Sequence, residues 1–269
     1  MLGAIIGDVV GSRFEFDNIK RKDFPLFDEH CDFTDDSVMT LAIAAALLNS
    51  KKDYSDLKEK AVEYMQKFGR ETYPWGRGYG GMFKEWLHSD DPQPYNSWGN
   101  GAAMRVSPCG FFGKDIEEVK IISKCMTEVT HNHPEGIKGA EATSVVVFMA
   151  KNGSKIPEIK KYICDNYYNI DFTIDKIRPF YGFAESCQET VPQALEAFFE
   201  STDFEDAIRN AVSIGGDSDT IAAITGGVAE AYYGIPEKIK KAVLPYLDDN
   251  FTRILGMAYD KLGIEMNIS

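Results

Sequence analysis

The sequence predicts an all-α protein with a single compact multi-helix domain over residues 1–269. Hydrophobic residues recur at helical spacing along most of the chain, whereas the sustained alternation that is typical of strands is rare. With 269 residues and 44% hydrophobic content, the chain is long enough to bury a large core. No Pro/Ser-rich spacer, low-complexity run or short repeat divides it. We therefore expect one domain.

The helical segments can be placed from their periodicity and their start signals. Asp203 can cap the helix that follows it, and Pro236 stands in the first turn of another. The long segments without a helical pattern are 73–81 and 91–113, and functional sites are frequent in such loops. The predicted helices are 37–49, 56–68, 80–87, 116–127, 135–150, 155–166, 193–200, 204–213, 219–233, 236–247 and 252–262.

Two acidic clusters stand at the heads of predicted buried helices. The first comprises Thr34, Asp35, Asp36 and Ser37, and the second comprises Gly215, Gly216, Asp217, Ser218, Asp219 and Thr220. Helix capping is an alternative explanation for each cluster, because Asp, Ser and Thr are good N-caps. Capping uses one oxygen per helix, however, and each cluster offers two carboxylates plus hydroxyls. A surplus of hard oxygen ligands indicates one shared site for Mg²⁺ or Mn²⁺.

The spacing of the second cluster favours ligands on a loop. Asp217 and Asp219 are two residues apart and would diverge on a regular helix. On a turn loosened by Gly215 and Gly216, both carboxylates can point to the same ion.

Composition narrows the classes of partner. The formal charge of −13 disfavours nucleic acid and anionic lipid as partners. The beginning of the chain lacks a basic leader, and no apolar run approaches the ~18 residues that span a bilayer. The five cysteines are scattered without a Cys-x-x-Cys pair, and His131 and His133 lack the partners of a zinc site. We expect a cytoplasmic protein without a membrane partner.

Five motifs, in order, resemble those of the ADP-ribosylglycohydrolase family, to which the dinitrogenase-reductase-activating glycohydrolases belong. The resemblance runs from residue 3 to about residue 234, and several motifs in the same order are far more specific than any one of them. The motifs are GDVVGSRFE (7–15), FTDDS (33–37), GNGAAMR (99–105), TH (130–131) and GDSDT (216–220).

The resemblance implies an all-α fold with two Mg²⁺ or Mn²⁺ ions in a central cleft. It also implies hydrolysis of the bond between ADP-ribose and an acceptor. Glu15 matches a mobile acidic residue that is proposed in parts of the family to orient or deprotonate the attacking water; an exposed loop glutamate is the alternative. The residues that match the family's metal ligands are Thr34, Asp35, Asp36, Asp217, Asp219 and Thr220.

The loop 95–102 fits a cradle for a diphosphate and a ribose. Its small residues let backbone N–H groups approach phosphate oxygens, and its Asn side chains can bond ribose hydroxyls. In the resembling proteins this segment holds ADP-ribose, and His131 matches a histidine near the phosphates or ribose. Asn100 and Arg105 have the alternative role of bracing the loop, which we prefer for Arg105. The substrate-binding candidates are Asn96, Ser97, Trp98, Gly99, Asn100, Gly101 and His131.

Aromatic residues near this loop could contact the ligand. Trp98, Tyr79 and Trp75 could stack on adenine, although loop aromatics more often serve hydrophobic packing, and we favour only Trp98. The Gly- and aromatic-rich segment 72–81 could line the acceptor side of the cleft. Tyr79→Ala would then weaken processing of the modified acceptor more than binding of free ADP-ribose.

Cleavage of the bond to ribose develops oxocarbenium character. The site must therefore hold the ribose, orient a water and help the acceptor leave. Paired cations lower the pKa of bound water and can clamp the ribose hydroxyls. Asp36 or Glu15 would accept the proton of the water, and the sequence does not decide between them. No Cys or Ser nucleophile motif is present, which favours direct attack by water.

The sequence does not identify the acceptor to which ADP-ribose is attached. Arginine on a protein is the first choice, because the motifs look most like the bacterial arginine-directed branch; serine-linked or small-molecule conjugates are alternatives, with ADP-ribose as the product in each case. Two alternative hypotheses belong to other functional classes of protein. One is a noncatalytic ADP-ribose-binding module, and the other is a metal-dependent hydrolase of phosphate esters or nucleotides, which lacks support from a phosphatase-type signature or Walker loop.

Overall fold

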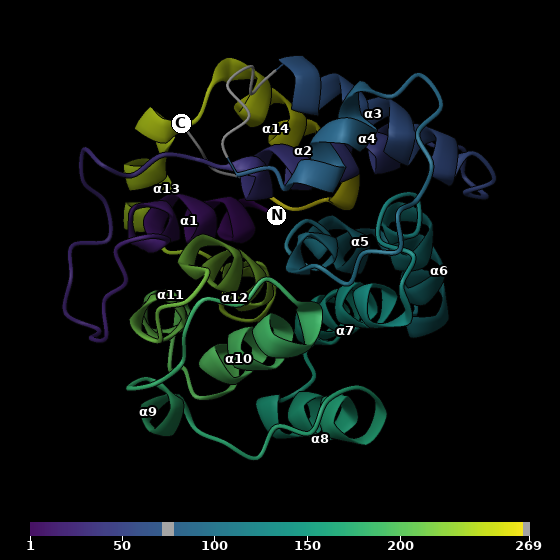
Figure 1. Ribbon diagram of the computed structural model, residues 1–269. Helices are drawn as coiled ribbons and strands as arrows, with labels where there is room; N and C mark the ends of the chain where they lie inside the picture. The colour runs from purple at the N-terminus through teal and green to yellow at the C-terminus, as the bar shows by residue number, and fades with distance from the viewer. Residues whose placement is uncertain (72–77, 266–269) are drawn as a thin grey trace.

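Figure 1 shows the computed structural model, which describes residues 1–71 and 78–265. Over these ranges the regular structure is helical, apart from an isolated antiparallel bridge between Gly99 and Ser186. The all-α prediction is confirmed. None of the described helices combines the length and the apolar character needed to cross a membrane.

The helices follow one another along the described chain with short 3-10 turns at three places. The α-helices are α1 (Leu2–Gly11), α2 (Asp35–Asn49), α3 (Leu57–Glu71), α4 (Gly81–His88), α5 (Ser107–Phe112), α6 (Ile116–Thr127), α7 (Pro134–Lys151), α8 (Ile156–Asn166), α9 (Ile174–Ile177), α10 (Cys187–Phe199), α11 (Phe204–Ser213), α12 (Ser218–Tyr233), α13 (Glu237–Val243) and α14 (Asp249–Leu262). The 3-10 helices are η1 (Ser12–Phe14), η2 (Asn100–Ala102) and η3 (Leu244–Tyr246).

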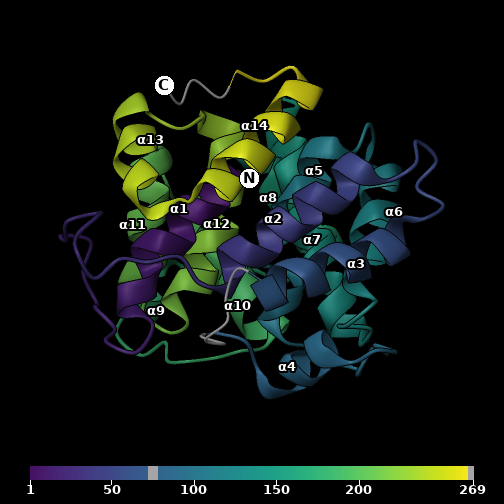
Figure 2. The same ribbon diagram turned by 90° about the horizontal axis from the view of Figure 1, so that it is seen from above.

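Helix α12 lies at the centre of the molecule, and α1, α7, α10 and α11 pack around it (Figure 1). Every residue of α12 from Ser218 to Ala229 is buried, as expected for its run of small apolar residues. Helix α2 is nearly as deeply buried and packs against α3 and α14, as Figure 2 shows from above. Both acidic clusters therefore begin helices that run through the core.

Glycines bring α1 and α12 into direct backbone contact. Gly3, Gly7 and Gly11 are four residues apart and so share one face of α1. A Cβ atom on Gly7 would stand 1.9 Å from the carbonyl oxygen of Ala222, and one on Gly3 would stand 2.3 Å from that of Gly226. Helix α1 is absent from the predicted helices because glycine costs about 1 kcal/mol relative to alanine in a helix interior. Close packing offsets that cost here.

Nine of the predicted helices coincide with observed ones to within three residues at each end, and Asp203 caps α11 by accepting from the backbone N–H of Asp206 at 2.8 Å. The other differences have local causes. Helix α10 begins at Cys187 and not at residue 193, because Pro192 lies inside the helix and does not start it. Helix α5 and η2 lie within 91–113, a segment predicted to be non-helical, and the single-turn helix α9 is too short to show periodicity.

Candidate active site

The start of α2 is capped by a residue of another helix. Thr34 is the N-cap residue, and Asp8 of α1 accepts from the backbone N–H groups of Thr34 at 2.9 Å and Ser37 at 3.0 Å. The hydroxyls of the same two residues also donate to the carboxylate of Asp8. Thr34 itself also takes the capping role that was the alternative for the first cluster, since its hydroxyl oxygen accepts from the backbone N–H of Asp36 at 3.4 Å. The carboxylates of Asp35 and Asp36 remain available for a ligand.

The structure joins the two acidic clusters. The hydroxyl of Thr220, on α12, donates to Oδ2 of Asp36, on α2, at 3.2 Å. Asp217 is the N-cap residue of α12 but makes no capping hydrogen bond; its carboxylate accepts from the side-chain amide of Asn100 at 2.7 Å. Oδ1 of Asp36 is buried and has no hydrogen-bond partner among the described residues. A buried carboxylate oxygen without a donor is a position where a cation fits.

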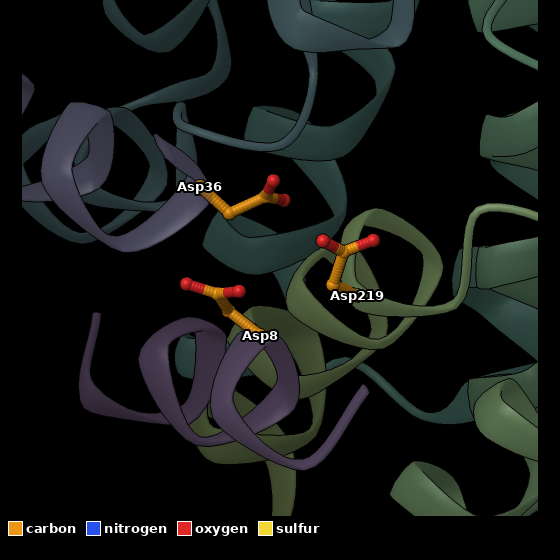
Figure 3. Close-up of side chains that lie close together, drawn as sticks. All are labelled: Asp8, Asp36 and Asp219. Carbon is orange, nitrogen blue, oxygen red and sulfur yellow. The ribbon is translucent and has the colours of Figure 1, made fainter. Parts of the chain in front are cut away.

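Two groups of three carboxylates converge between these helices. Asp8, Asp36 and Asp219 point toward one another (Figure 3), and one oxygen of each lies within 4.8 Å of the others. Glu15, Asp217 and Asp219 form a second group that meets the same limit. We call these groups the two carboxylate triads. They share Asp219, and all their ligand atoms are hard oxygens of the kind that Mg²⁺ and Mn²⁺ prefer.

The pKa values of these acids reflect the crowding of buried negative charge. Burial, followed by repulsion from Asp8, raises the pKa of Asp36 well above its usual range. Burial and then Asp217 do the same to the pKa of Asp219. The pKa of Asp8 rises to about 6, through burial, despite its four hydrogen bonds. Burial and then Asp217 raise the pKa of Glu15 to about 7. A bound cation would oppose each of these shifts.

Four of the five triad residues, Glu15, Asp36, Asp217 and Asp219, line a cavity of about 740 Å³, a volume within the usual range of small-molecule sites. The loop 95–101 and residues 183–189 contribute to the lining as well. Asp35 also lines the cavity, but it belongs to neither triad. Its Oδ1 lies against Gly78, where a Cβ would stand 1.9 Å from that oxygen and where φ is +87°. Only glycine fits this approach.

The predicted substrate-binding loop lies on the cavity wall, and its residues differ in what they contact. The hydroxyl of Ser97 accepts from the backbone N–H of Gly99 at 3.1 Å, which shapes the turn. Trp98 is 49% exposed, and its ring lies 5.2 Å from that of His133. Asn96 is exposed and has a φ of +53°. Asn96 and Trp98 therefore lie exposed on the cavity wall.

The side chain of Asn100 braces the site. Its amide donates to Asp217 and, at 3.2 Å, to the hydroxyl of Thr190 on α10, while its backbone N–H donates to the carbonyl of Glu185 at 2.7 Å. Asn100 therefore ties the loop to the second triad and to the segment before α10. This is the bracing role that was the alternative for this residue.

His131 lies at the cavity wall behind Gly99 and Gly101 and is 6% exposed. Burial, followed by the positive charge of Arg105, lowers the pKa of His131 well below its usual range, so the ring is neutral at pH 7. Arg105 is buried and makes its hydrogen bonds to Thr130 and His131. We expected Arg105 to brace the loop 95–102. Its hydrogen bonds instead hold Thr130 and His131.

The segment 72–81 is only partly described. Residues 72–77, which include Trp75, lie outside the described residues. Tyr79 is 4% exposed and packs on Phe83, with ring centroids 5.3 Å apart. Tyr79 is therefore behind the wall, and the lining of the cavity here comes from Gly78 and from 80–83.

Sequence reasoning did not select Asp8 as a site residue, although it is the only charged residue in the apolar run of α1, a signal that could have identified it. It also passed over Glu185 and Glu189, which line the cavity. Nothing in their local sequence distinguishes them from solvated surface glutamates.

The described residues form a helical core with carboxylates gathered at the starts of two buried helices, beside a glycine-rich loop, an arrangement that suits metal-assisted hydrolysis. Residues 1–266 match the family model described as ADP-ribosylglycohydrolase. The chain belongs to this family and is an ADP-ribosylglycohydrolase.

Curated relatives agree with this assignment. The chain is 25% identical to ADP-ribosylhydrolase ARH3 of Gallus gallus, over 87% of this chain and 84% of the relative. It is also 25% identical to ADP-ribosylarginine hydrolase Tri1 of Pseudomonas putida (strain GB-1), over 90% of this chain and 72% of the relative. A solved structure titled "ADP-ribosylglycohydrolase-related protein complex" superposes with a TM-score of 0.72 at 21% identity, covering 98% of this chain and 96% of that one, and supports the fold.

Proposed function

We propose that this protein hydrolyses the glycosidic bond between ADP-ribose and an arginine side chain of a modified protein, with two divalent cations held by the two acidic clusters. The observation that carries the proposal is the pair of triads that share Asp219 on the wall of the 740 Å³ cavity. Two adjacent positions for hard cations beside one ligand cavity are suited to a reaction that must hold a sugar and activate a water.

The residues present fit the cations. Among the described residues, Asp36 offers an oxygen without a partner and Asp217 a carboxylate without a capping bond, while Asp219 accepts from the backbone N–H of Thr220 through Oδ1. When bound, the cations would lower the pKa of a coordinated water and neutralise developing charge. The proposed ligands are Thr34, Asp35, Asp36, Asp217, Asp219 and Thr220, with Asp8 orienting the first cluster.

Glu15 is the better placed of the two candidate bases. It follows the 3-10 turn η1, is half-buried and lines the cavity. Asp36 is 2% exposed, and its Oδ2 already accepts from Thr220. Glu15 would accept the proton of the attacking water, while Asp36 would serve as a ligand. Loop 95–101 would hold the diphosphate and ribose of the substrate.

The charge of the cavity supports arginine as the acceptor. Among the described lining residues, seven carboxylates face one guanidinium, that of Arg105. Two divalent cations would neutralise four of these negative charges, and Glu15, Glu185 and Glu189 line the cavity outside the proposed ligand set. Excess negative charge favours a cationic guanidinium as leaving group over a neutral serine hydroxyl. The name of the Tri1 relatives, ADP-ribosylarginine hydrolase, points to the same acceptor.

The test is release of intact ADP-ribose, identified by mass, from proteins carrying ADP-ribose on arginine or on serine. Each substrate is incubated with the protein after chelation and again after addition of Mg²⁺ or Mn²⁺. Asp36→Ala is compared with Asp115→Ala as a matched control, since Asp115 caps α6 by accepting from Glu118 at 2.8 Å and does not line the cavity.

We expect metal-dependent release from the arginine-linked substrate, abolished by Asp36→Ala and retained in Asp115→Ala. Release from the serine-linked substrate alone would overturn the acceptor. Binding of ADP-ribose without turnover of any conjugate would overturn catalysis and favour a binding module. Appearance of AMP in place of ADP-ribose would indicate phosphoester chemistry.

A further inference from the structure

Arg105 is a buried cation in the cavity wall that no described carboxylate pairs with. It is 1% exposed, and its guanidinium lies over the ring of Phe83, 5.5 Å from the centroid. One terminal nitrogen, Nη2, donates to the hydroxyl of Thr130 at 2.6 Å and lies 3.3 Å from Nδ1 of His131. A buried charge is costly unless its hydrogen bonds are specific, so this arrangement calls for an explanation.

The contact between Arg105 and His131 determines which imidazole nitrogen carries the proton. A guanidinium has five N–H donors and no acceptor, and it stays protonated in proteins. Nδ1 of His131 must therefore present its lone pair to Arg105. The hydroxyl oxygen of Thr130 accepts from Arg105 and lies 2.8 Å from the same Nδ1 and 3.2 Å from the carbonyl oxygen of Thr127, so turning its one proton from that carbonyl to Nδ1 adds to the contact. A proton on Nδ1 would place N–H against N–H.

The proton of the neutral ring then lies on Nε2, at the edge of the ring that faces the loop. A Cβ atom on Gly99 would stand 3.5 Å from Nε2, and one on Gly101 would stand 3.4 Å from it. Both glycines line the cavity, as does His131, and Nε2 has no hydrogen-bond partner among the described residues. The absence of side chains on these glycines leaves the N–H group accessible to a ligand oxygen.

We propose that Arg105 and Thr130 are positioning residues that hold His131 as its Nε2–H tautomer, so that the ring is a fixed neutral donor to an oxygen of the bound ligand. The identity of that oxygen, in the diphosphate or ribose of ADP-ribose, rests on the proposed function. The tautomer does not, because it follows from contacts within the protein.

A neutral donor suits this position. The lowered pKa of His131 keeps the ring from adding a proton at Nδ1, which would oppose Arg105. Because the orientation of the ring is fixed in advance, the ligand would not have to select among tautomers or ring flips on binding.

The tautomer can be measured without any ligand by ¹⁵N NMR of the imidazole nitrogens of the intact protein. The chain has four histidines, so the signals of His131 are identified by their loss in His131→Gln. We expect a protonated Nε2 and an unprotonated Nδ1. An Nδ1–H signal, or two nitrogens with averaged shifts, would overturn the proposal. Thr130→Val, which removes the hydroxyl without altering a buried charge, should shift the Nδ1 signal, whereas Thr130→Ser should not.

The donor role is tested by ADP-ribose binding in two conservative variants. The side-chain amide nitrogen of His131→Gln can reach the position of Nε2, whereas that of His131→Asn reaches only the position of Nδ1. We expect the Kd to change by less than about threefold in His131→Gln and to rise about tenfold in His131→Asn, the loss of roughly one hydrogen bond. Equal weakening in both variants would overturn the donor role.

These outcomes separate the inference from the function on which it partly rests. If the wild-type protein shows the Nε2–H tautomer but does not bind ADP-ribose, the proposed ligand is wrong and the positioning role of Arg105 stands. If it binds ADP-ribose while His131 carries its proton on Nδ1, the positioning role is wrong and the proposed ligand stands.

Discussion

The two walls of the cavity differ in the charge of the residues that line them. One wall carries four carboxylates of the two triads, those of Glu15, Asp36, Asp217 and Asp219, whereas the fifth, Asp8, does not line the cavity. The other is formed by the loop 95–101 with His131 and Arg105 and offers backbone N–H groups, a neutral imidazole and one guanidinium. The first wall needs added positive charge, whereas the second is complete as folded. A ligand with both a phosphate and a sugar end would therefore be oriented by the difference between the walls.

The strongest test of the charged wall is Asp219→Asn, because this residue belongs to both triads. We expect hydrolysis to fall on the order of 10³-fold, as when a charge-stabilising group is lost, with no rise in Tm on adding Mg²⁺ or Mn²⁺. Asp115→Asn, at an ordinary helix start, is the matched control.

The same variant should gain stability without metal. The pKa of Asp219 is raised by folding, so ionisation of this carboxyl destabilises the folded state as pH rises through that range. A neutral side chain removes this cost at pH 7. Urea unfolding in the presence of a chelator should show a higher free energy of unfolding for Asp219→Asn than for the wild type. A lower value would mean that repulsion among the buried carboxylates does not destabilise the folded state.

Contact between the helices that carry the charged wall can be broken at Gly7. A methyl group there meets the backbone of Ala222 at 1.9 Å, so α1 and α12 must separate, and we expect a loss of about 3 kcal/mol in the free energy of unfolding. Gly256→Ala in α14 is the control, since no atom lies within 4 Å of its added Cβ. It should be neutral or slightly stabilising. Similar effects in the two variants would show that helix contact is not the cause.

A smaller effect is expected from Asp8→Asn. The amide nitrogen of Asn would face donor groups of Thr34 and Ser37, and the charge-assisted bonds would be lost, with a cost of about 2 kcal/mol. Metal affinity, measured by titration calorimetry, should also fall. Asp203→Asn, at a cap within a single helix, should cost less than about 1 kcal/mol and leave metal binding unchanged. Unaltered metal affinity in Asp8→Asn would limit this residue to a structural role.

The smallest effect should come from the loop wall. Trp98→Ala removes a half-exposed ring that lines the cavity, and we expect the Kd for ADP-ribose to rise about fivefold, or ~1 kcal/mol, without a change in Tm. Phe180→Ala removes an exposed ring outside the lining and should leave the Kd unchanged. An unchanged Kd in Trp98→Ala would show that the ring does not contact adenine.

The helical fold and the meeting of the two acidic clusters could be predicted because each rests on local signals. Helical periodicity is encoded within a few turns, and carboxylates at the starts of two buried helices have few ways to be neutralised. The contact of Thr220 with Asp36 confirms that the clusters meet, although 184 residues separate them.

What could not be predicted depends on tertiary contact. Helix α1 was missed because glycine is unfavourable in isolated helices, and only the facing backbone of α12 makes it suitable. Asp8 was missed as a site residue because its function as a cap belongs to a different helix from its own. The effect of Arg105 on His131 depends on the distance between two atoms, which no spacing in the sequence encodes.

The face of α1 formed by Gly3, Gly7 and Gly11 also limits which substitutions the site can accept. Gly11 leaves room for the backbone of Asp219 itself, whose Cα would lie 2.5 Å from an added Cβ. The separation between the first and last helices of the site is thus fixed by main-chain atoms in contact and not by interlocking side chains. A single methyl group on this face would shift the carboxylates together.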